Sequence, residues 1–335
     1  MRFVCGFVVA VCACFGPAIN AADRLPAYKG DAQGTSVSGL SSGAFMAMQY
    51  QVAFSASVKG AGVVAGGPYY CAAGIVLNVS TCMGQVANKP PVPTLMVAAA
   101  RSFASSGRID ALDHLKNHRV YVFSGSNDDV VRRPAVDATV AFYKLAGVGD
   151  DAIQYVNTVP AGHGLITPSY GSACGTNASP WLNHCTVDGS GYDQAGAILG
   201  QIHGPLNAPV AALTGKLLAF DQGEFASNAA RMADEAYVYV PGSCASGTAC
   251  RLHIAFHGCA QSAKVVGDKF YMNAGYNRWA DTNNMIVLYP QVNSSLLNLQ
   301  GCWDWFGYTG GSYPTKTGPQ LAAVKAMADR LLGGQ

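Results

Sequence analysis

The feature that most constrains the fold of this chain is a serine held between glycines in residues 39–43, Gly-Leu-Ser-Ser-Gly. This run follows an apolar-alternating segment, 35–38, and precedes a helix-prone one that begins at Ala44. In a Gly-x-Ser-x-Gly turn between a strand and a helix, small flanking residues let the backbone turn sharply and lift the serine hydroxyl above the sheet. The pattern predicts that Ser41 is a nucleophile and that the Ser42 amide faces an oxyanion. The alternative is a Gly/Ser-rich turn in which Ser42 caps the helix.

Short apolar runs alternate with helical stretches along the chain, which is typical of an α/β sheet with helices on both faces. No internal repeat or Pro/Thr-rich linker interrupts the pattern, so we expect residues 22–335 to form one catalytic domain without a separate substrate-binding domain. Residues 164–191 are rich in turn formers and are expected to be an irregular loop tied by a disulfide. Strands are expected at 35–39, 58–65, 119–124, 153–159, 236–240, 252–256 and 285–289, and helices at 43–53, 134–146, 194–202, 271–282 and 319–332.

The N-terminal residues have the order of a secretory signal. Arg2 precedes an almost wholly apolar stretch, 3–15, and small residues follow at 18–22. Because the stretch is too short to span a bilayer comfortably, we expect a signal peptide at 1–21, cleavage after Ala21 or Ala22, and a secreted protein, extracellular or periplasmic. A retained membrane anchor and a lipid anchor at Cys14 are the alternatives.

Cysteine usage agrees with export. Of the 11 cysteines, three fall in the signal segment and eight remain. None of the eight forms a Cys-x-x-Cys knuckle, so zinc has little support, and disulfides are expected in an oxidising compartment. Spacing does not determine connectivity, and neighbour pairing is the simplest proposal: Cys71 with Cys82, Cys174 with Cys185, Cys244 with Cys250, and Cys259 with Cys302.

Charge is sparse and nearly balanced, with a net charge of +2 and 12% charged residues. No basic run indicates nucleic acid, and no second apolar stretch indicates a membrane span. Low charge with abundant Gly, Tyr and Ser suits a protein, expected to be a monomer, that acts on an uncharged and rather apolar material.

A nucleophile needs a base and a group that orients the base. The expected strand 119–124 runs into Gly-Ser-Asn-Asp-Asp-Val-Val at 125–131, and the Gly-x-x-Asp-x-x-Val spacing selects Asp128 as the acid, with Asp129 as the alternative. The expected strand 153–159 is followed by His163 between two glycines, which leave it sterically free. The order Ser, Asp, His, each after its own strand, predicts a triad. Taken singly, a turn-forming Asp and an exposed loop His are the competing interpretations.

Residues 257–261, His-Gly-Cys-Ala-Gln, look like the His-Gly loop that supplies a second oxyanion amide in α/β-hydrolases. We interpret His257 as structural and the Cys259 backbone amide as the donor; a nucleophilic Cys259 thiol is the alternative. In an ordinary α/β-hydrolase this loop precedes the nucleophile, whereas here it follows the whole predicted triad. The rotated order indicates a circularly permuted fold, which is tolerable when the original termini lie close together.

Four motifs in this order, at 38–46, 257–261, 289–291 and 301–307, resemble the circularly permuted, single-domain form of the extracellular polyhydroxybutyrate depolymerases. The resemblance covers nearly the whole mature chain. It implies an α/β-hydrolase fold, a Ser41–His163–Asp128 triad, and oxyanion amides from Ser42 and Cys259. It further implies hydrolysis of poly(3-hydroxybutyrate) or related short-chain polyhydroxyalkanoates, with a polyester or oligoester as partner and without cofactor or metal.

Aromatic residues complete the expectation. Trp303, Trp305 and Tyr308, with Tyr69, are expected to line an apolar crevice for ester units. The alternative is that the two tryptophans pack in the core beside a Cys302 disulfide. A secreted carbohydrate esterase of the feruloyl or acetylxylan type and a non-catalytic polymer-binding protein are the rival functions.

Overall fold

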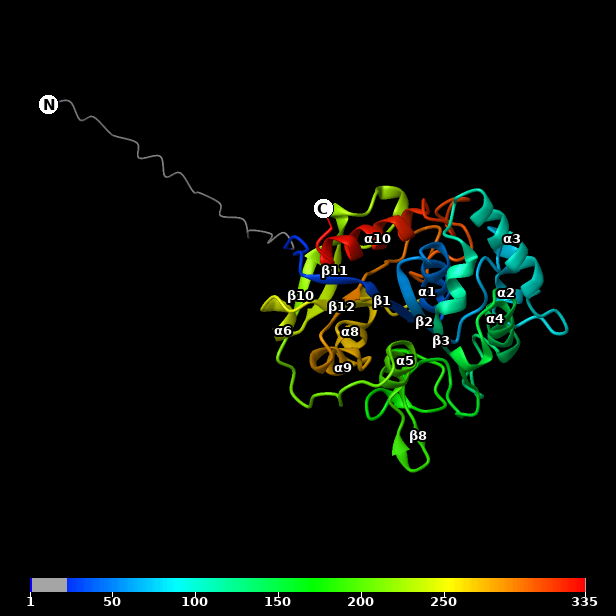
Figure 1. Ribbon diagram of the computed structural model, residues 1–335, viewed down its shortest axis with the longest axis horizontal. Helices are drawn as coiled ribbons and strands as arrows, with labels where there is room; N and C mark the ends of the chain where they lie inside the picture. Colours follow the sequence, from blue (N-terminus) through cyan, green and yellow to red (C-terminus); the bar gives the residue numbers. More distant parts are fainter. Residues whose placement is uncertain (2–22, 335) are drawn as a thin grey trace.

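The computed structural model describes Met1 and residues 23–334, arranged around an eight-stranded sheet (Figure 1). The strand order is β10-β11-β13-β12-β1-β2-β3-β4. Every neighbouring pair from β13 to β4 is parallel, while β11 is antiparallel to both β13 and β10. The expected mixed α/β architecture with a mostly parallel sheet is therefore confirmed. The strands are β1 (Gly30–Leu40), β2 (Val58–Val64), β3 (Arg119–Phe123), β4 (Ile153–Val156), β10 (Lys216–Asp221), β11 (Glu235–Val240), β12 (Cys250–Phe256) and β13 (Met285–Tyr289).

Helices cover the sheet on both sides: α1 and α10 lie on one side in Figure 1, and α5 and α9 on the other. All twelve residues of α1 are buried, so this helix is the centre of the core rather than an amphipathic surface helix. The helices are α1 (Ser42–Ala53), α2 (Val79–Cys82), α3 (Pro93–Ser105), α4 (Arg133–Leu145), α5 (Gln194–His203), α6 (Gly242–Ala245), α7 (Ala263–Val266), α8 (Lys269–Asn273), α9 (Tyr276–Thr282) and α10 (Pro319–Leu331).

Glycines in β2 let α5 approach the sheet closely. A Cβ added at Gly62 would lie 2.7 Å from the Ile198 side chain, and one added at Gly60 would lie 2.1 Å from the Arg119 carbonyl oxygen. Bulkier residues would push the helix and the neighbouring strand away, since interiors are packed too densely to absorb a clash.

The sequence-based elements differ from the structure in several places. The single helix expected at 271–282 is wrong: α8 and α9 are separated by Gly275, whose φ of 97° lies in the left-handed region that glycine adopts readily. The edge strand β10 and the helix α3 were not expected. Residues 164–191 contain five short strands: β5 (Leu165–Thr167), β6 (Ser172–Ala173), β7 (Leu182–His184), β8 (Thr186–Val187) and β9 (Ser190–Gly191).

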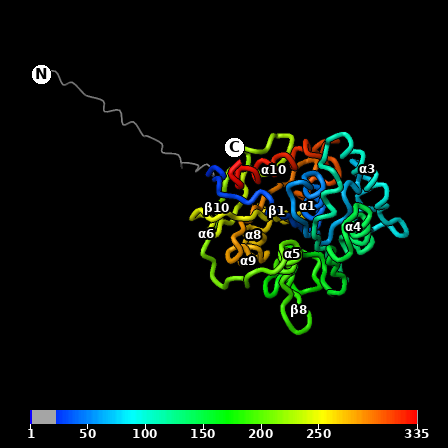
Figure 2. The backbone as a smooth tube through the Cα atoms, in the orientation of Figure 1, coloured from blue at the N-terminus to red at the C-terminus, as the bar shows by residue number. Residues whose placement is uncertain are grey.

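The two ends of the described main part, residues 23–334, meet at one side of the molecule. The blue and red ends of the trace run together in Figure 2, and the Tyr28 amide donates a hydrogen bond to the Leu331 carbonyl at 3.1 Å. The predicted signal segment, 1–21, falls outside the described residues apart from Met1. Within the described part, no helix is both long enough and apolar enough to span a membrane.

Four disulfides join the eight cysteines, each to its neighbour in the sequence. Three of these bonds join cysteines 6 to 11 residues apart, whereas Cys259–Cys302 spans 43 residues. Disulfides constrain the unfolded chain and persist in oxidising compartments. The bonds are Cys71–Cys82, Cys174–Cys185, Cys244–Cys250 and Cys259–Cys302.

Candidate active site

Ser41 occupies the tight turn between β1 and α1. Its φ of 57° and ψ of −123° are strained for a non-glycine residue, and such strain is commonly found at functional sites. The flanking glycines are required by close backbone approaches: a Cβ on Gly39 would lie 2.2 Å from the Gly43 carbonyl oxygen, and one on Gly43 would lie 2.3 Å from that of Phe256. The Ser41 amide donates to the Val64 carbonyl at 3.0 Å, which anchors the turn to β2. This is the strand–turn–helix geometry of a nucleophile elbow.

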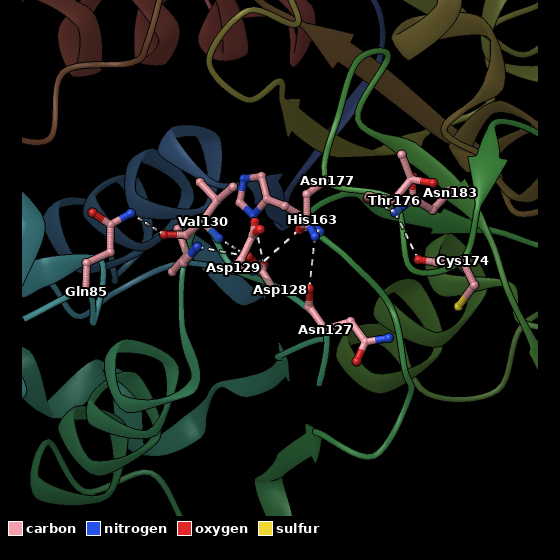
Figure 3. Close-up of polar contacts among 11 residues, drawn as sticks. Gln85, Asn127, Asp128, Asp129, Val130, His163, Cys174, Thr176, Asn177 and Asn183 are labelled. Atoms are coloured by element: carbon pink, nitrogen blue, oxygen red, sulfur yellow. Dashed lines mark hydrogen bonds and ion pairs between the residues drawn. The ribbon is translucent and has the colours of Figure 1, made fainter. Parts of the chain in front are cut away.

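Asp128 and His163 form a buried pair beyond the ends of β3 and β4 (Figure 3). The His163 Nδ1–H donates to Asp128 Oδ2 at 2.8 Å, and the two side chains are 5% and 1% exposed. The other carboxylate oxygen, Oδ1, accepts from the Val130 and Val131 amides, each at 2.9 Å. Asp129, the alternative acid, is exposed and carries no such pairing. The structure therefore brings Asp128, rather than Asp129, to the imidazole.

Ser42 and Cys259, whose backbone amides are the predicted oxyanion donors, line the same cavity as Ser41. Ser42 opens α1, where the helix dipole favours negative charge, and Cys259 lies in the loop after β12. Neither amide makes a hydrogen bond with the residues that the structure describes. The amide of Gly258, directly before Cys259, does: it donates to Gln261 Oε1 at 2.7 Å. Unpaired amides at the start of a helix and in a facing loop are the elements of an oxyanion hole.

His257 is held as a neutral structural residue. Its Nδ1–H donates to the Gly258 carbonyl at 2.7 Å, and its Nε2 accepts from the Val292 amide at 3.0 Å. Burial lowers the pKa of His257 to about 4. The Cys259 sulfur is bound to Cys302, so the alternative of a Cys259 thiol nucleophile is excluded.

The predicted nucleophile, the predicted base and the two predicted oxyanion residues share the wall of one apolar cavity of about 570 Å³. Ser41, Ser42, His163 and Cys259 lie on the wall, and no Asp, Glu, Lys or Arg among the described residues lines it. Exposed aliphatic side chains on this wall come from two segments far apart in the sequence. They are Val76 from one segment, and Leu296, Leu297 and Leu299 from the other.

The aromatic prediction needs correction for three of its four residues. Trp305 lies on the cavity wall and stacks on Phe45 with ring centroids 4.1 Å apart. Trp303 is fully buried against Phe256, and Tyr69 is buried with its hydroxyl donating to the Pro314 carbonyl, so both are core residues. Tyr308 turns its hydroxyl to the Cys302 carbonyl instead of to the cavity. A large aromatic side chain fills a core and a binding site equally well, so sequence alone does not separate the two.

The loop that carries Trp305 is organised by a buried carboxylate that sequence reasoning missed. Asp304 Oδ1 accepts from the amides of Gly307 and Tyr308 at 2.6 and 3.1 Å, and Oδ2 accepts from the Thr309 amide at 2.8 Å. Burial raises the pKa of Asp304. The hydrogen bonds satisfy the buried carboxylate, which would otherwise be costly. These hydrogen bonds hold the backbone of the loop that carries Trp305.

Two further residues that were missed tie the site loops together. The Asn177 side chain bonds to backbone on both sides of Asp128 and to the His163 amide (Figure 3). The Gln261 Nε2 donates to the carbonyls of Pro180 and Trp181, each at 3.0 Å. Trp181 then meets the His163 ring edge to face at 5.8 Å. No periodicity or motif in the turn-rich segment 164–191 marks these contacts.

An elbow serine and a histidine on the wall of one cavity, with a buried aspartate behind the histidine, form an arrangement typical of serine hydrolases. No family model matches the chain. A poly(3-hydroxybutyrate) depolymerase of Delftia acidovorans is 44% identical over 331 residues, which cover 97% of this chain and 65% of that relative, so the chain spans less than two thirds of its length. A polyhydroxybutyrate depolymerase of Talaromyces funiculosus is 39% identical over 338 residues, which cover 95% of each chain.

Solved structures agree with these relatives. The crystal structure of the PHB depolymerase from Penicillium funiculosum is 37% identical, superposes with a TM-score of 0.85, and is matched over 93% of this chain and 100% of its own. A serine-to-alanine variant of a PHB depolymerase, complexed with an R3HB trimer, is 36% identical and also has a TM-score of 0.85 over the same shares. The chain belongs to the polyhydroxybutyrate depolymerase family.

Proposed function

We propose that this chain is a secreted serine esterase that hydrolyses the ester bonds of poly(3-hydroxybutyrate), or of related short-chain polyhydroxyalkanoates and their oligomers. The observation that carries the proposal is the placement of Ser41, His163, Ser42 and Cys259 on the wall of one apolar cavity, with the last two amides unpaired among the described residues. The family and the R3HB trimer bound by a relative support the same substrate class.

The mechanism is acyl transfer through Ser41. Because Asp128 holds the His163 Nδ1–H, Nε2 is the imidazole nitrogen left to take the serine proton. The serine oxygen then attacks the ester carbonyl, and the amides of Ser42 and Cys259 stabilise the negative charge that develops. His163 returns the proton to the departing alcohol, which leaves an acyl-enzyme. Water, activated by His163, attacks the acyl group and releases a hydroxyacid or its oligomer.

The character of the cavity favours an uncharged polyester over a carbohydrate ester. Sugar hydroxyls need converging polar side chains, whereas this wall is aliphatic and aromatic apart from the reacting groups, Asn298 and Gln300. Part of the aliphatic wall is also open to solvent, with Leu296 94% exposed and Val76 65% exposed. Large apolar side chains gathered at an exposed site indicate a binding surface. A solid or oligomeric polyester fits that surface.

The finer assignment of the fold is a circularly permuted α/β-hydrolase. It is supported by the nucleophile elbow at the end of β1 and by the His-Gly loop after β12, the strand that pairs with β1. The contact between Tyr28 and Leu331 supports it as well, since permutation requires chain ends that lie close together. The four disulfides support a secreted location, and the signal peptide at 1–21 stays a prediction.

A direct comparison of substrates tests the proposed function. The purified protein is assayed on a poly(3-hydroxybutyrate) suspension, on a chromogenic short-chain ester, and on feruloyl and acetyl carbohydrate esters. We expect clearing of the suspension and hydrolysis of the short-chain ester, with little turnover of the carbohydrate esters. A preference for a carbohydrate ester would mean that the protein is a carbohydrate esterase and not a polyester hydrolase. Failure on every ester while the protein is folded would favour a polymer-binding protein.

A further inference from the structure

One side-chain amide, that of Asn177, joins the two loops that carry the buried pair (Figure 3). Its Oδ1 accepts from the His163 amide at 2.6 Å and from the Asp129 amide at 3.4 Å. Its Nδ2 donates to the Asn127 carbonyl at 3.0 Å. The amide therefore bonds to the backbone on both sides of Asp128 and to the backbone of His163 itself.

The position of this bridge matters because the backbone pairing of the two loops stops just before it. The β3–β4 ladder ends at Phe123 and Val156. Beyond it, amides of the first loop donate to carbonyls of the second at Ser126–Val159 and at Asn127–Ala161, at 2.9 and 3.0 Å. The next link, at the level of the functional residues, is made by the Asn177 side chain.

The loop that contains Asn177 is held by a disulfide and by side-chain hydrogen bonds. The Cys174–Cys185 disulfide closes this loop, and the Asn183 Nδ2 donates to the Cys174 and Thr176 carbonyls at 3.2 and 2.8 Å. The Cys174 carbonyl also accepts from the Gly162 amide at 2.8 Å, next to His163. Because Asn177 bonds to the His163 amide, the position of the 174–185 loop helps to fix the position of the imidazole.

We propose that Asn177 is a positioning residue that sets the His163 backbone against the Asp128 loop and so aligns Nδ1 with Oδ2. The proposal rests on the proposed function, since it concerns the same site. Asn177 does not line the cavity. Its loss therefore misplaces the base without removing a substrate contact, and the cost falls on kcat rather than on KM.

The test is kinetic and spectroscopic on the whole protein, with a soluble short-chain ester as substrate. Asn177→Ala is expected to lower kcat by about 10- to 100-fold, the cost of a base displaced by a fraction of an ångström to an ångström, and to leave KM within about twofold. The far-downfield proton resonance of the Nδ1–H···Oδ2 hydrogen bond is expected to broaden or shift. Asn177→Asp keeps the acceptor for the His163 and Asp129 amides but replaces the donor to the Asn127 carbonyl with an oxygen, so it is expected to recover only part of kcat.

Asn283→Ala is the matched control. The Asn283 amide also bridges two segments, since Oδ1 accepts from the Asn207 amide at 2.8 Å and Nδ2 donates to the Asn207 and Trp279 carbonyls at 3.0 and 2.8 Å. It lies away from the cavity wall. Its loss is expected to lower Tm to a similar extent as Asn177→Ala while kcat and the downfield resonance stay as in the wild type.

Three results would overturn the inference: kcat for Asn177→Ala within about threefold of wild type, a resonance that does not change, or a loss of kcat that Asn283→Ala reproduces. Each of these leaves the proposed function standing as long as Ser41→Ala is inactive. Conversely, an active Ser41→Ala variant would end the proposed function. The resonance would still report whether Asn177 aligns the buried pair.

Discussion

The carboxylate of Asp128 divides its two oxygens between His163 and the backbone: Oδ2 lies 2.8 Å from Nδ1 of the imidazole, and Oδ1 accepts from two amides of its own loop. The amides fix the plane of the carboxylate, and the carboxylate in turn fixes the imidazole as the Nδ1–H tautomer, with Nε2 free. For the proposed base, His163, this orientation is set before substrate arrives, so little reorganisation is needed during the reaction.

The acid is tested by a pair of adjacent substitutions. Asp128→Asn should lower kcat by roughly 10⁴-fold, because the amide no longer stabilises the imidazolium or selects the correct tautomer. Asp129→Asn should leave most of the activity, since Asp129 is exposed. Steady-state kinetics on a soluble ester measure both. If the two effects were reversed, the assignment of the acid would be wrong by one position and the Ser–His part would remain.

The Cys259–Cys302 disulfide joins stability to catalysis. It closes a loop across 43 residues and ties the loop of the Cys259 amide to the segment that carries Trp305. Replacing both cysteines with serine should lower stability by about 3–4 kcal/mol on chain-entropy estimates. It should lower kcat as well, because a poorly placed oxyanion donor loses much of its effect. Thermal melts and kinetics are the measurements.

The control for that disulfide is the Cys244–Cys250 pair, which spans only 6 residues and does not line the cavity. Its double serine variant should lose roughly 2 kcal/mol on the same estimate and keep its kcat. Equal losses of kcat in the two double variants would mean that the Cys259–Cys302 bond does not specifically position the Cys259 amide.

Acid should destabilise the fold through a buried histidine away from the cavity. His118 Nε2–H donates to the Ser55 carbonyl at 3.0 Å, its Nδ1 accepts from Gln51, and burial lowers the pKa of His118 to about 4. Because this pKa is depressed from an ordinary value of 6.5, the stability linked to the neutral form is present above pH 6.5. It is lost as the pH falls toward about 4, at roughly 1.4 kcal/mol per pH unit.

The variant His118→Gln isolates this effect. It should be less stable than the wild type near neutral pH, and the gap should narrow in acid because glutamine does not titrate. Denaturant unfolding at about pH 7.5 and about pH 4.5 measures the gap. Stability curves that run parallel between these two values would contradict the assignment.

The exposed aliphatic side chains of the cavity wall should matter for solid polymer more than for soluble ester. The double variant Val76→Gln with Leu296→Gln removes two exposed apolar side chains of the cavity wall, one from each segment. Adsorption to polymer granules and clearing of the suspension should fall several-fold, while kcat on a soluble short-chain ester stays within about twofold. Leu213→Gln, an exposed leucine outside the cavity wall, is the control. Equal losses on both substrates would assign these side chains to the reaction rather than to adsorption.

The parts of the site that follow strands were accessible from the sequence. The Ser41 turn is a local feature, since its glycines and the flanking strand and helix lie within a few residues. Asp128 and His163 each follow an apolar run, and strands that are adjacent and parallel bring their following loops together at one edge of the sheet. The parallel pairing of β3 and β4 therefore brings Asp128 and His163 together, which their spacing in the sequence alone does not show.

The parts that depend on irregular backbone were not accessible. Asn177 and Gln261 act through a turn-rich segment in which no period of 2 or 3.6 residues marks a face. Trp303 belongs to an aromatic cluster that is expected to line an apolar crevice, and its neighbours Cys302 and Trp305 do line the cavity. Its own side chain is buried in the core instead. The break at Gly275 had a local signal, a glycine between two helical runs, that the helical pattern around it outweighed.

The measurement that tests the central claim most directly is the clearing of a poly(3-hydroxybutyrate) suspension by the wild type and by Ser41→Ala, with Tm recorded for both. The account predicts that the wild type clears the suspension, and that Ser41→Ala loses activity by several orders of magnitude at an unchanged Tm. Ser42→Ala should be mild, because the proposed role of Ser42 uses its backbone amide. Near-normal clearing by a natively melting Ser41→Ala protein would contradict the account.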